Sequence, residues 1–269
     1  MPLSQLLLLG AIAGYTIFLG LPFARLRYVS ERWSIGAGAA SAGILLFLVV
    51  DITEHMLEPI EEAAKNLTQN GASDLALLSL AALAGIAIGF LGLLYLSSFM
   101  ARRSKTSNSP GGAMAAILDD PLRLALTIAI GIGLHNFAEG LAIGQAAATG
   151  TVNLALVLII GFALHNATEG FGITGPLIGH VRPPWRFLLL VGLIGGSPTF
   201  VGTLLGRVYS NAAISTLFLS LAAGSIIYVV QTLIYTGLRS QKSEVFSIGL
   251  LVGLVVGIAT DLIIAAAGV

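Results

Sequence analysis

Long apolar stretches of about 20 residues or more alternate with short polar segments along the whole chain. A stretch of this length is what an α-helix needs to cross the hydrocarbon core of a bilayer. The pattern predicts eight membrane-spanning helices, at 3–23, 34–57, 74–100, 121–148, 152–178, 185–208, 211–238 and 245–268. Because the number is even, we expect both ends of the chain on one side of the membrane.

The composition supports this prediction. The chain is 56% hydrophobic and only 10% charged, with a mean hydropathy of +0.95, whereas soluble domains carry about 25% charged residues. It therefore indicates an all-α integral membrane protein with the lipid bilayer as its surroundings. The formal net charge is zero, so nothing points to a nucleic-acid partner. The first apolar run has no basic segment before it, and we interpret it as a span rather than a removed signal peptide.

The basic residues predict the orientation. Eleven of the 13 Lys and Arg residues fall in the loops after the first, third, fifth and seventh spans or at the start of the fourth. Only Lys65 and Arg207 fall on the opposite side. Lys and Arg are enriched in cytoplasmic loops, so we expect both termini on the non-cytoplasmic side. The compact loops favour the plasma (inner) membrane of a prokaryote.

One segment interrupts the apolar pattern. Residues 101–120 are polar and rich in Ser and Gly, which is typical of a flexible loop. We expect this loop to be cytoplasmic and to lie within a single transmembrane domain that covers residues 1–269.

A repeated motif is the main chemical feature of the chain. Gly133–Gly140 reads GLHNFAEG, and thirty residues later Ala163–Gly170 reads ALHNATEG. In each copy the His and the Glu are four residues apart, which places them on the same face of a helix. Ionisable groups at membrane depth are costly and normally face a cavity or the bundle interior, so they are functional candidates.

The two motifs together predict a metal site. Imidazole nitrogens and carboxylate or amide oxygens are ligands for divalent transition metals, and the chain has no Cys to supply thiolates. Because only a short turn separates the two spans, they are expected to pack antiparallel with their motifs facing each other. In a single copy, the His and the Glu could simply form a hydrogen bond with each other. Two copies instead favour a metal site that both motifs share. The predicted ligands are His135, Asn136, Glu139, His165, Asn166 and Glu169.

The second span carries a polar stripe of its own, formed by Asp51, Glu54, His55, Glu58 and Glu62. Four of these share one helical face, and Glu54 lies beside it. All five are candidates for a metal path, and we expect it foremost of Asp51 and His55, because these follow the apolar run directly. The alternative, a helix end at headgroup depth, is stronger for Glu58 and Glu62.

Two further spans contain breaking signals. Gly175-Pro176 in the fifth span and Gly195-Gly196-Ser197-Pro198 in the sixth are expected to kink or break their helices. Asp261 in the last span stands as a lone buried acid, for which packing and proton relay remain alternatives.

At the paired motifs, the chain resembles the ZIP (Zrt-, Irt-like) family of divalent-metal transporters. The resemblance implies a compact bundle of eight transmembrane helices in a 3+2+3 arrangement with inverted repeats. It also implies a one- or two-metal site built from the six predicted ligands, and no prosthetic group. The transported substrate would be Zn²⁺ foremost, with Fe²⁺, Mn²⁺ or Cd²⁺ as alternatives, moving toward the cytoplasm.

The chain departs from the family pattern in three places. Ala138 and Thr168 stand where the family usually has Pro, Asn166 stands where an acid is common, and Ser197-Pro198 replaces Glu-Pro. Fewer carboxylates weaken a divalent site. We therefore predict one strong metal site and a second that is weak or missing. Ser197 stays a candidate for the metal path. The Asp51/His55 stripe is expected to compensate for the carboxylates that are absent.

Two other classes of protein remain as alternatives to a metal carrier working by alternating access. An intramembrane metal-dependent hydrolase is disfavoured because both motifs read His-Asn-x-x-Glu rather than His-Glu-x-x-His, and no Gly-x-Ser-x-Gly is present. A proton-coupled solute carrier would leave the doubled His unexplained. The sequence thus predicts a transporter rather than an enzyme. It leaves open the metal, the driving ion, a channel mechanism and a homodimer.

Overall fold

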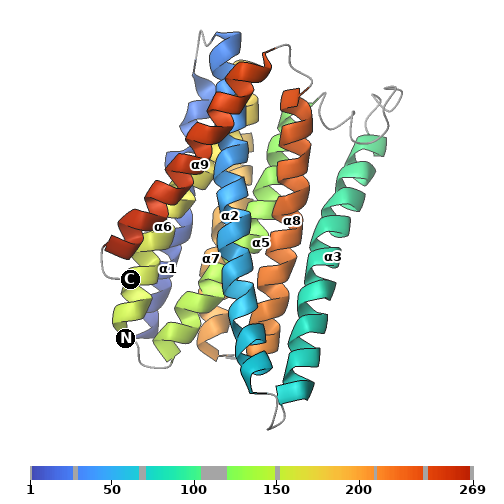
Figure 1. Ribbon diagram of the computed structural model, residues 1–269. Coiled ribbons are helices and arrows are strands. Elements are labelled where there is room, and N and C mark those ends of the chain that lie inside the picture. The colour runs from blue at the N-terminus through green and yellow to red at the C-terminus, as the bar shows by residue number, and fades with distance from the viewer. Residues whose placement is uncertain are drawn as a thin grey trace.

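The computed structural model describes residues 2–26, 30–66, 71–103, 120–148, 152–208, 211–238 and 242–266 (Figure 1). Within these ranges the chain forms eight α-helices and no strands, so the prediction of an all-α bundle is confirmed. The α-helices are α1 Leu3–Tyr15, α2 Glu31–Lys65, α3 Ala72–Arg103, α5 Pro121–Ala148, α6 Val152–Thr174, α7 Trp185–Val208, α8 Ala212–Leu238 and α9 Ser243–Ala266. Short 3₁₀ segments are η1 Thr16–Leu19, η2 Leu21–Arg25 and η4 Gly175–Leu177.

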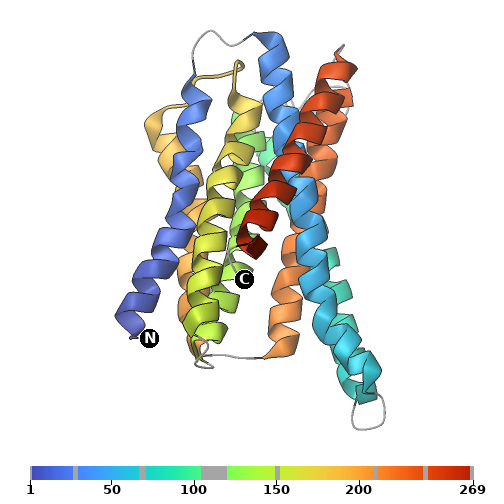
Figure 2. The same cartoon turned by 60° about the vertical axis from the view of Figure 1, so that its left-hand side comes forward.

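Among the described residues, seven spans are long and apolar enough to cross a membrane, with α1, η1 and η2 counted as one. The helix α6 supplies the eighth position of the bundle. Successive helices alternate in direction, so α1 begins and α9 ends toward the same side (Figures 1 and 2). We call this the terminal side and the other the opposite side. The protein is thus a multi-pass integral membrane protein.

The helices α2 and α3 both continue beyond the predicted ends of their spans. The helix α2 continues eight residues beyond its predicted end at 57, through Pro59 to Lys65. The Glu and Ala residues of this extension are good helix formers, so the helix outlasts its apolar part. The helix α3 runs to Arg103, into the segment predicted as a flexible loop. Residues 104–119 of that loop lie outside the described residues.

The predicted breaking signals have different outcomes. The helix α6 ends at Thr174 and passes into η4 at Gly175, as predicted for Gly175-Pro176. The helix α7 instead remains helical across Pro198. The first span changes from α-helix to 3₁₀ geometry at Thr16. Apart from Gly20 and Pro22, its sequence from there on contains no helix-breaking residues that would have predicted this change.

Glycine contacts show that the bundle has an internal repeat. On α5, a Cβ at Gly140 would collide with the carbonyl oxygen of Thr199 on α7. On α6, thirty residues later, a Cβ at Gly170 would collide with the carbonyl oxygen of Ile17 in the first span. The same backbone-to-backbone crossing therefore occurs twice, with α5 equivalent to α6 and the first span equivalent to α7.

The outer helices repeat in the same way. A Cβ at Gly89 of α3 would collide with the carbonyl oxygen of Leu221 on α8, and a Cβ at Gly253 of α9 would collide with that of Ala40 on α2. This makes α2 equivalent to α8 and α3 equivalent to α9. Because equivalent helices run in opposite directions, the structure has the 3+2+3 arrangement with inverted repeats that the family resemblance implied. Small residues permit such close approach in membrane bundles.

Candidate metal site

The antiparallel helices α5 and α6 bring the two motifs together inside the bundle. His135 Nε2 lies 3.8 Å from Glu169 Oε1, and the two imidazole rings are 6.1 Å apart between centroids. Ligand atoms of His135, His165 and Glu169 all lie within 4.8 Å of one another. A cluster of this size can hold one metal ion between the two helices.

Within the first motif, helical geometry pairs the imidazole with its own carboxylate. His135 Nε2 lies 3.0 Å from Glu139 Oε1, one helical turn away. The same nitrogen therefore faces carboxylates from both helices. Glu139 joins the cluster through this contact. The carboxylates of Glu139 and Glu169 thus both approach the imidazole of His135.

All six residues of the two motifs are buried, with exposed fractions between 0% and 7%. Each of them carries at least one buried nitrogen or oxygen without a hydrogen-bond partner. Among the described residues, only Thr199 and Thr216 contribute further side-chain atoms of this kind. Buried polar groups without partners are costly, and a bound cation would satisfy the carboxylate, amide and imidazole acceptors at once.

The two asparagines have a second, structural role. Asn136 donates from Nδ2 to the carbonyl oxygen of Gly195 on α7 at 2.9 Å, and Asn166 donates to that of Ala13 on α1 at 3.1 Å. In each residue the amide oxygen Oδ1 remains unpaired. The nitrogen end thus ties each motif to a flanking helix, and the oxygen end is left as a weak metal ligand.

A cavity of about 210 Å³ reaches the first motif. Its lining includes His135 and Glu139 from α5, Phe162 from α6, Asp51, His55 and Glu58 from α2, and Ser215 and Leu219 from α8. Phe162 lies in the first half of α6, Ser215 near the start of α8, and Gln145 near the end of α5. The cavity therefore extends from the motif toward the terminal side. His165 and Glu169 are not in its lining.

The polar stripe of α2 divides along its length. Asp51, with 28% of its side chain exposed, and His55, with 58%, form an i,i+4 pair in which His55 Nδ1 lies 3.8 Å from Asp51 Oδ1. Together with Glu58 they line the cavity. Glu54 is exposed on the adjacent face and does not line it. Glu62 lines a separate surface cavity beside Asp74 and Asn211.

Two other predicted polar positions lie elsewhere. Ser197 on α7 is within 3.4 Å of the Tyr15 hydroxyl on α1, away from the cavity lining. Asp261 was expected to be buried but is exposed. It lies one turn beyond Gly257, which packs on Phe47 of α2, and this position leaves it close enough to interact electrostatically with Asp51.

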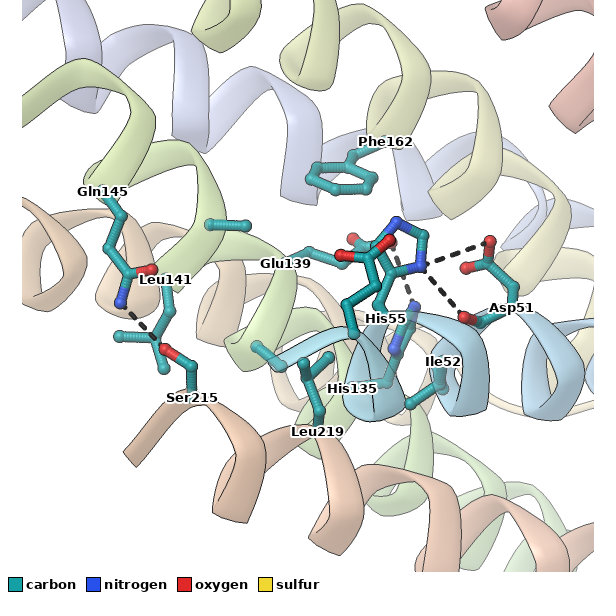
Figure 3. Close-up of a pocket in the computed structure, with 13 residues that line it drawn as sticks. Asp51, Ile52, His55, His135, Glu139, Leu141, Gln145, Phe162, Ser215 and Leu219 are labelled. Atoms are coloured by element: carbon teal, nitrogen blue, oxygen red, sulfur yellow. Dashed lines mark hydrogen bonds and ion pairs between the residues drawn. The ribbon is translucent and has the colours of Figure 1, made fainter. Parts of the chain in front are cut away.

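The end of the cavity nearest the terminal side was not predicted from the sequence. Gln145 Nε2 donates to Ser215 Oγ at 3.0 Å, which joins α5 to α8 near the terminal side. Figure 3 shows this pair lying apart from the group formed by Glu139, His55 and Asp51. Gln145 follows Ala138, Leu141 and Ala142 at helical spacing on one face of α5. An amide on the motif-bearing face of an apolar span was the signal that could have identified it.

These features define a class of protein, a multi-pass helical bundle with a buried His/Glu cluster that a cavity connects to one side. Comparison with known families agrees with this class. The family described as ZIP zinc transporter matches residues 115–265, more than half of the chain and including both motifs. The chain belongs to this family, and membership implies transport of divalent metal ions across a membrane. No curated protein matches the chain closely.

Proposed function

We propose that the protein carries divalent transition-metal ions, Zn²⁺ foremost, into the cytoplasm. We further propose that His135, Glu139, His165 and Glu169, with the Asn136 and Asn166 amide oxygens, bind the ion during transport. Among the described residues, the buried side-chain atoms without a hydrogen-bond partner belong almost entirely to these six, and this observation carries the proposal.

The donor set suits a transported ion. Zn²⁺ accepts imidazole nitrogen and carboxylate oxygen in tetrahedral sites, and Mn²⁺ and Fe²⁺ accept the same ligands. Amide oxygens bind more weakly than carboxylates. A carrier needs a site from which the ion can leave as well as enter, so a set with two carboxylates and two amides favours exchange over permanent storage. We therefore infer a transporter without a prosthetic group, rather than a metalloenzyme.

The direction of transport rests on two observations. The Lys and Arg residues cluster in the loops on the opposite side of the bundle, and this distribution favours that side as the cytoplasmic one. The cavity extends toward the terminal side and is lined by Asp51 and Glu58, whose charges would concentrate cations from outside. The protein would then be open to the outside in this structure, with both termini outside the cytoplasm. Its compact loops suit a prokaryotic plasma membrane.

Metal uptake into proteoliposomes tests the proposal. Zn²⁺, Mn²⁺, Fe²⁺ and Cd²⁺ would be compared for the wild type, Glu139→Gln and Glu169→Gln. The matched control is Glu54→Gln, which removes a carboxylate from α2 outside the cavity lining. We expect saturable wild-type flux, abolished by the two site variants and retained by the control.

A second readout is independent of flux. Zn²⁺ at about 100-fold above its dissociation constant should stabilise the wild type against unfolding by roughly 2.7 kcal/mol, and Glu169→Gln should lose most of this effect. Well-folded wild-type protein that neither moves nor is stabilised by any of the four metals would contradict the proposal.

A further inference from the structure

The inverted repeat assigns each cavity residue a counterpart on the other side of the metal site. Thirty residues separate equivalent positions of α5 and α6, as in Gly140 and Gly170. For α2 and α8 the interval is 181 residues, as in Ala40 and Leu221. By this register Glu139 corresponds to Glu169 and Asp51 corresponds to Thr232.

The two halves of the path differ in accessibility. Glu139 and Asp51 line the cavity, and Asp51 has 28% of its side chain exposed. Their counterparts Glu169 and Thr232 are both 0% exposed and do not line it. The structure is therefore open on the terminal side and closed on the opposite side.

Contacts between α2 and the end of α6 close the opposite side. Ser34 Oγ on α2 donates to the carbonyl oxygen of Ile178 at 2.5 Å. A Cβ at Gly175 would collide with the Ser41 hydroxyl, so the backbone of η4 lies directly on α2. Gly175 is the counterpart of Gln145, and Ser34 is the counterpart of Ser215. On the open side these two counterparts are joined by the long Gln145 side chain, which donates to Ser215 Oγ at 3.0 Å.

The two paths also differ in chemistry. Where α2 presents the Asp51 carboxylate, α8 presents the Thr232 hydroxyl, which donates to the carbonyl oxygen of Tyr228 at 2.8 Å. One turn beyond Asp51, the open path also carries the His55 imidazole. Carboxylate and imidazole attract and bind divalent cations, whereas a neutral hydroxyl binds them weakly.

We propose that in a second conformation Gly175 and Ile178 separate from α2, and that metal then leaves His165 and Glu169 past Thr232. In this conformation Thr232 sets the release rate, because a neutral hydroxyl at this position does not retain the ion. The protein would thus have a carboxylate, Asp51, on the terminal side where cations enter. It would have only a neutral hydroxyl at the equivalent position on the opposite side, where they leave. This inference rests on the proposed transport function and adds a residue that controls its rate.

Thiol labelling tests the second path, since the chain contains no Cys. Ser34→Cys and its counterpart Ser215→Cys would each be treated in sealed proteoliposomes of known orientation with a membrane-impermeant thiol reagent. We expect Ser215→Cys to react only from the terminal side and Ser34→Cys only from the opposite side. Reaction of Ser34→Cys from the terminal side, or its complete protection in a folded variant, would overturn the proposal. This labelling needs no metal, so its result is separable from a failure of wild-type uptake.

Thr232→Asp tests the release step. We expect this variant to retain Zn²⁺ more strongly in equilibrium binding and to slow release into a chelator by about tenfold, or ~1.4 kcal/mol. Ser220→Asp is the matched control, because Ser220 is equally buried on α8 but its side chain lies against Gly85 of α3. Unchanged release in a folded Thr232→Asp protein, or equal slowing in the control, would overturn the role of Thr232. Thr232→Asn, which adds an amide oxygen without a charge, should slow release less and serves if the Asp variant does not fold.

Discussion

Gly14 on α1 and Gly196 on α7 pack backbone to backbone, and a Cβ on either residue would collide with the carbonyl oxygen of the other. The residues that precede them, Ala13 and Gly195, supply the carbonyls that accept the Asn166 and Asn136 amides. The crossing of α1 and α7 therefore fixes the two backbone acceptors that anchor the motifs. Helix packing and the geometry of the candidate metal site depend on the same contact.

Replacing Gly14 with Ala should destabilise the protein. The added methyl group has no room at the helix crossing, and overpacking of this kind costs about 1–3 kcal/mol. The thermal melting temperature in detergent, measured without metal, would fall. Gly38→Ala and Gly92→Ala are the controls, since nothing lies within 4 Å of a Cβ at either position. These two should melt at or above the wild-type temperature, because Ala is the better helix former. Equal losses at all three positions would contradict the packing argument.

Asn136→Asp and Asn166→Asp should weaken the fold although each adds a carboxylate near the proposed ligands. An ionised Asp cannot donate to Gly195 or Ala13, so two acceptors would face each other in a buried position. Leaving a buried group without its partner costs about 1–3 kcal/mol. The melting temperature without metal should fall, and saturating Zn²⁺ should restore part of it by screening the new charge. A metal-free Asp variant as stable as the wild type would show that these amide bonds are not needed.

Asp51→Asn should impair metal capture without abolishing transport. Asp51 lies in the cavity but outside the His/Glu cluster, so it would attract the ion rather than hold it. We expect the half-saturating metal concentration to rise by about fivefold, equal to roughly 1 kcal/mol, with the maximal rate little changed. The effect should shrink at high ionic strength, because salt screens exposed charges. Glu54→Gln, one turn earlier than Glu58 and outside the lining, should cause a smaller rise. The reverse ranking of the two variants would argue against this path.

Ser197→Ala should leave metal affinity nearly unchanged, despite the position of Ser197 in the segment where the family usually has Glu-Pro. Its hydroxyl pairs with Tyr15 across the α1–α7 contact at 3.4 Å, which is a weak interaction away from the cavity. Zn²⁺ uptake at several concentrations would measure this directly. A marked rise in the half-saturating concentration would instead return Ser197 to the metal path.

Local patterns were sufficient where the interaction is local. The apolar lengths predicted the bundle, and the i,i+4 spacing correctly placed His135 beside Glu139 because helix geometry alone determines that relationship. The end of α2 could not be predicted in this way. Hydropathy marks where the membrane ends, but the residues beyond that point still favour a helix, so α2 continues. The predicted burial of Asp261 was wrong for a related reason, because hydropathy does not tell which face of a helix a neighbour covers.

The sequence by itself determined the class of protein, the number of helices and the two His–Asn–Glu motifs, since these depend on composition and on spacing within one helix. The tertiary structure decided which side of the site is open and which acids of α2 reach the cavity, separating Asp51 from Glu54 and Glu62. It also revealed the equivalence of Asp51 and Thr232. These features arise where glycine backbones from distant parts of the chain pack together, and no periodicity within a single helix specifies which distant backbone will be the partner.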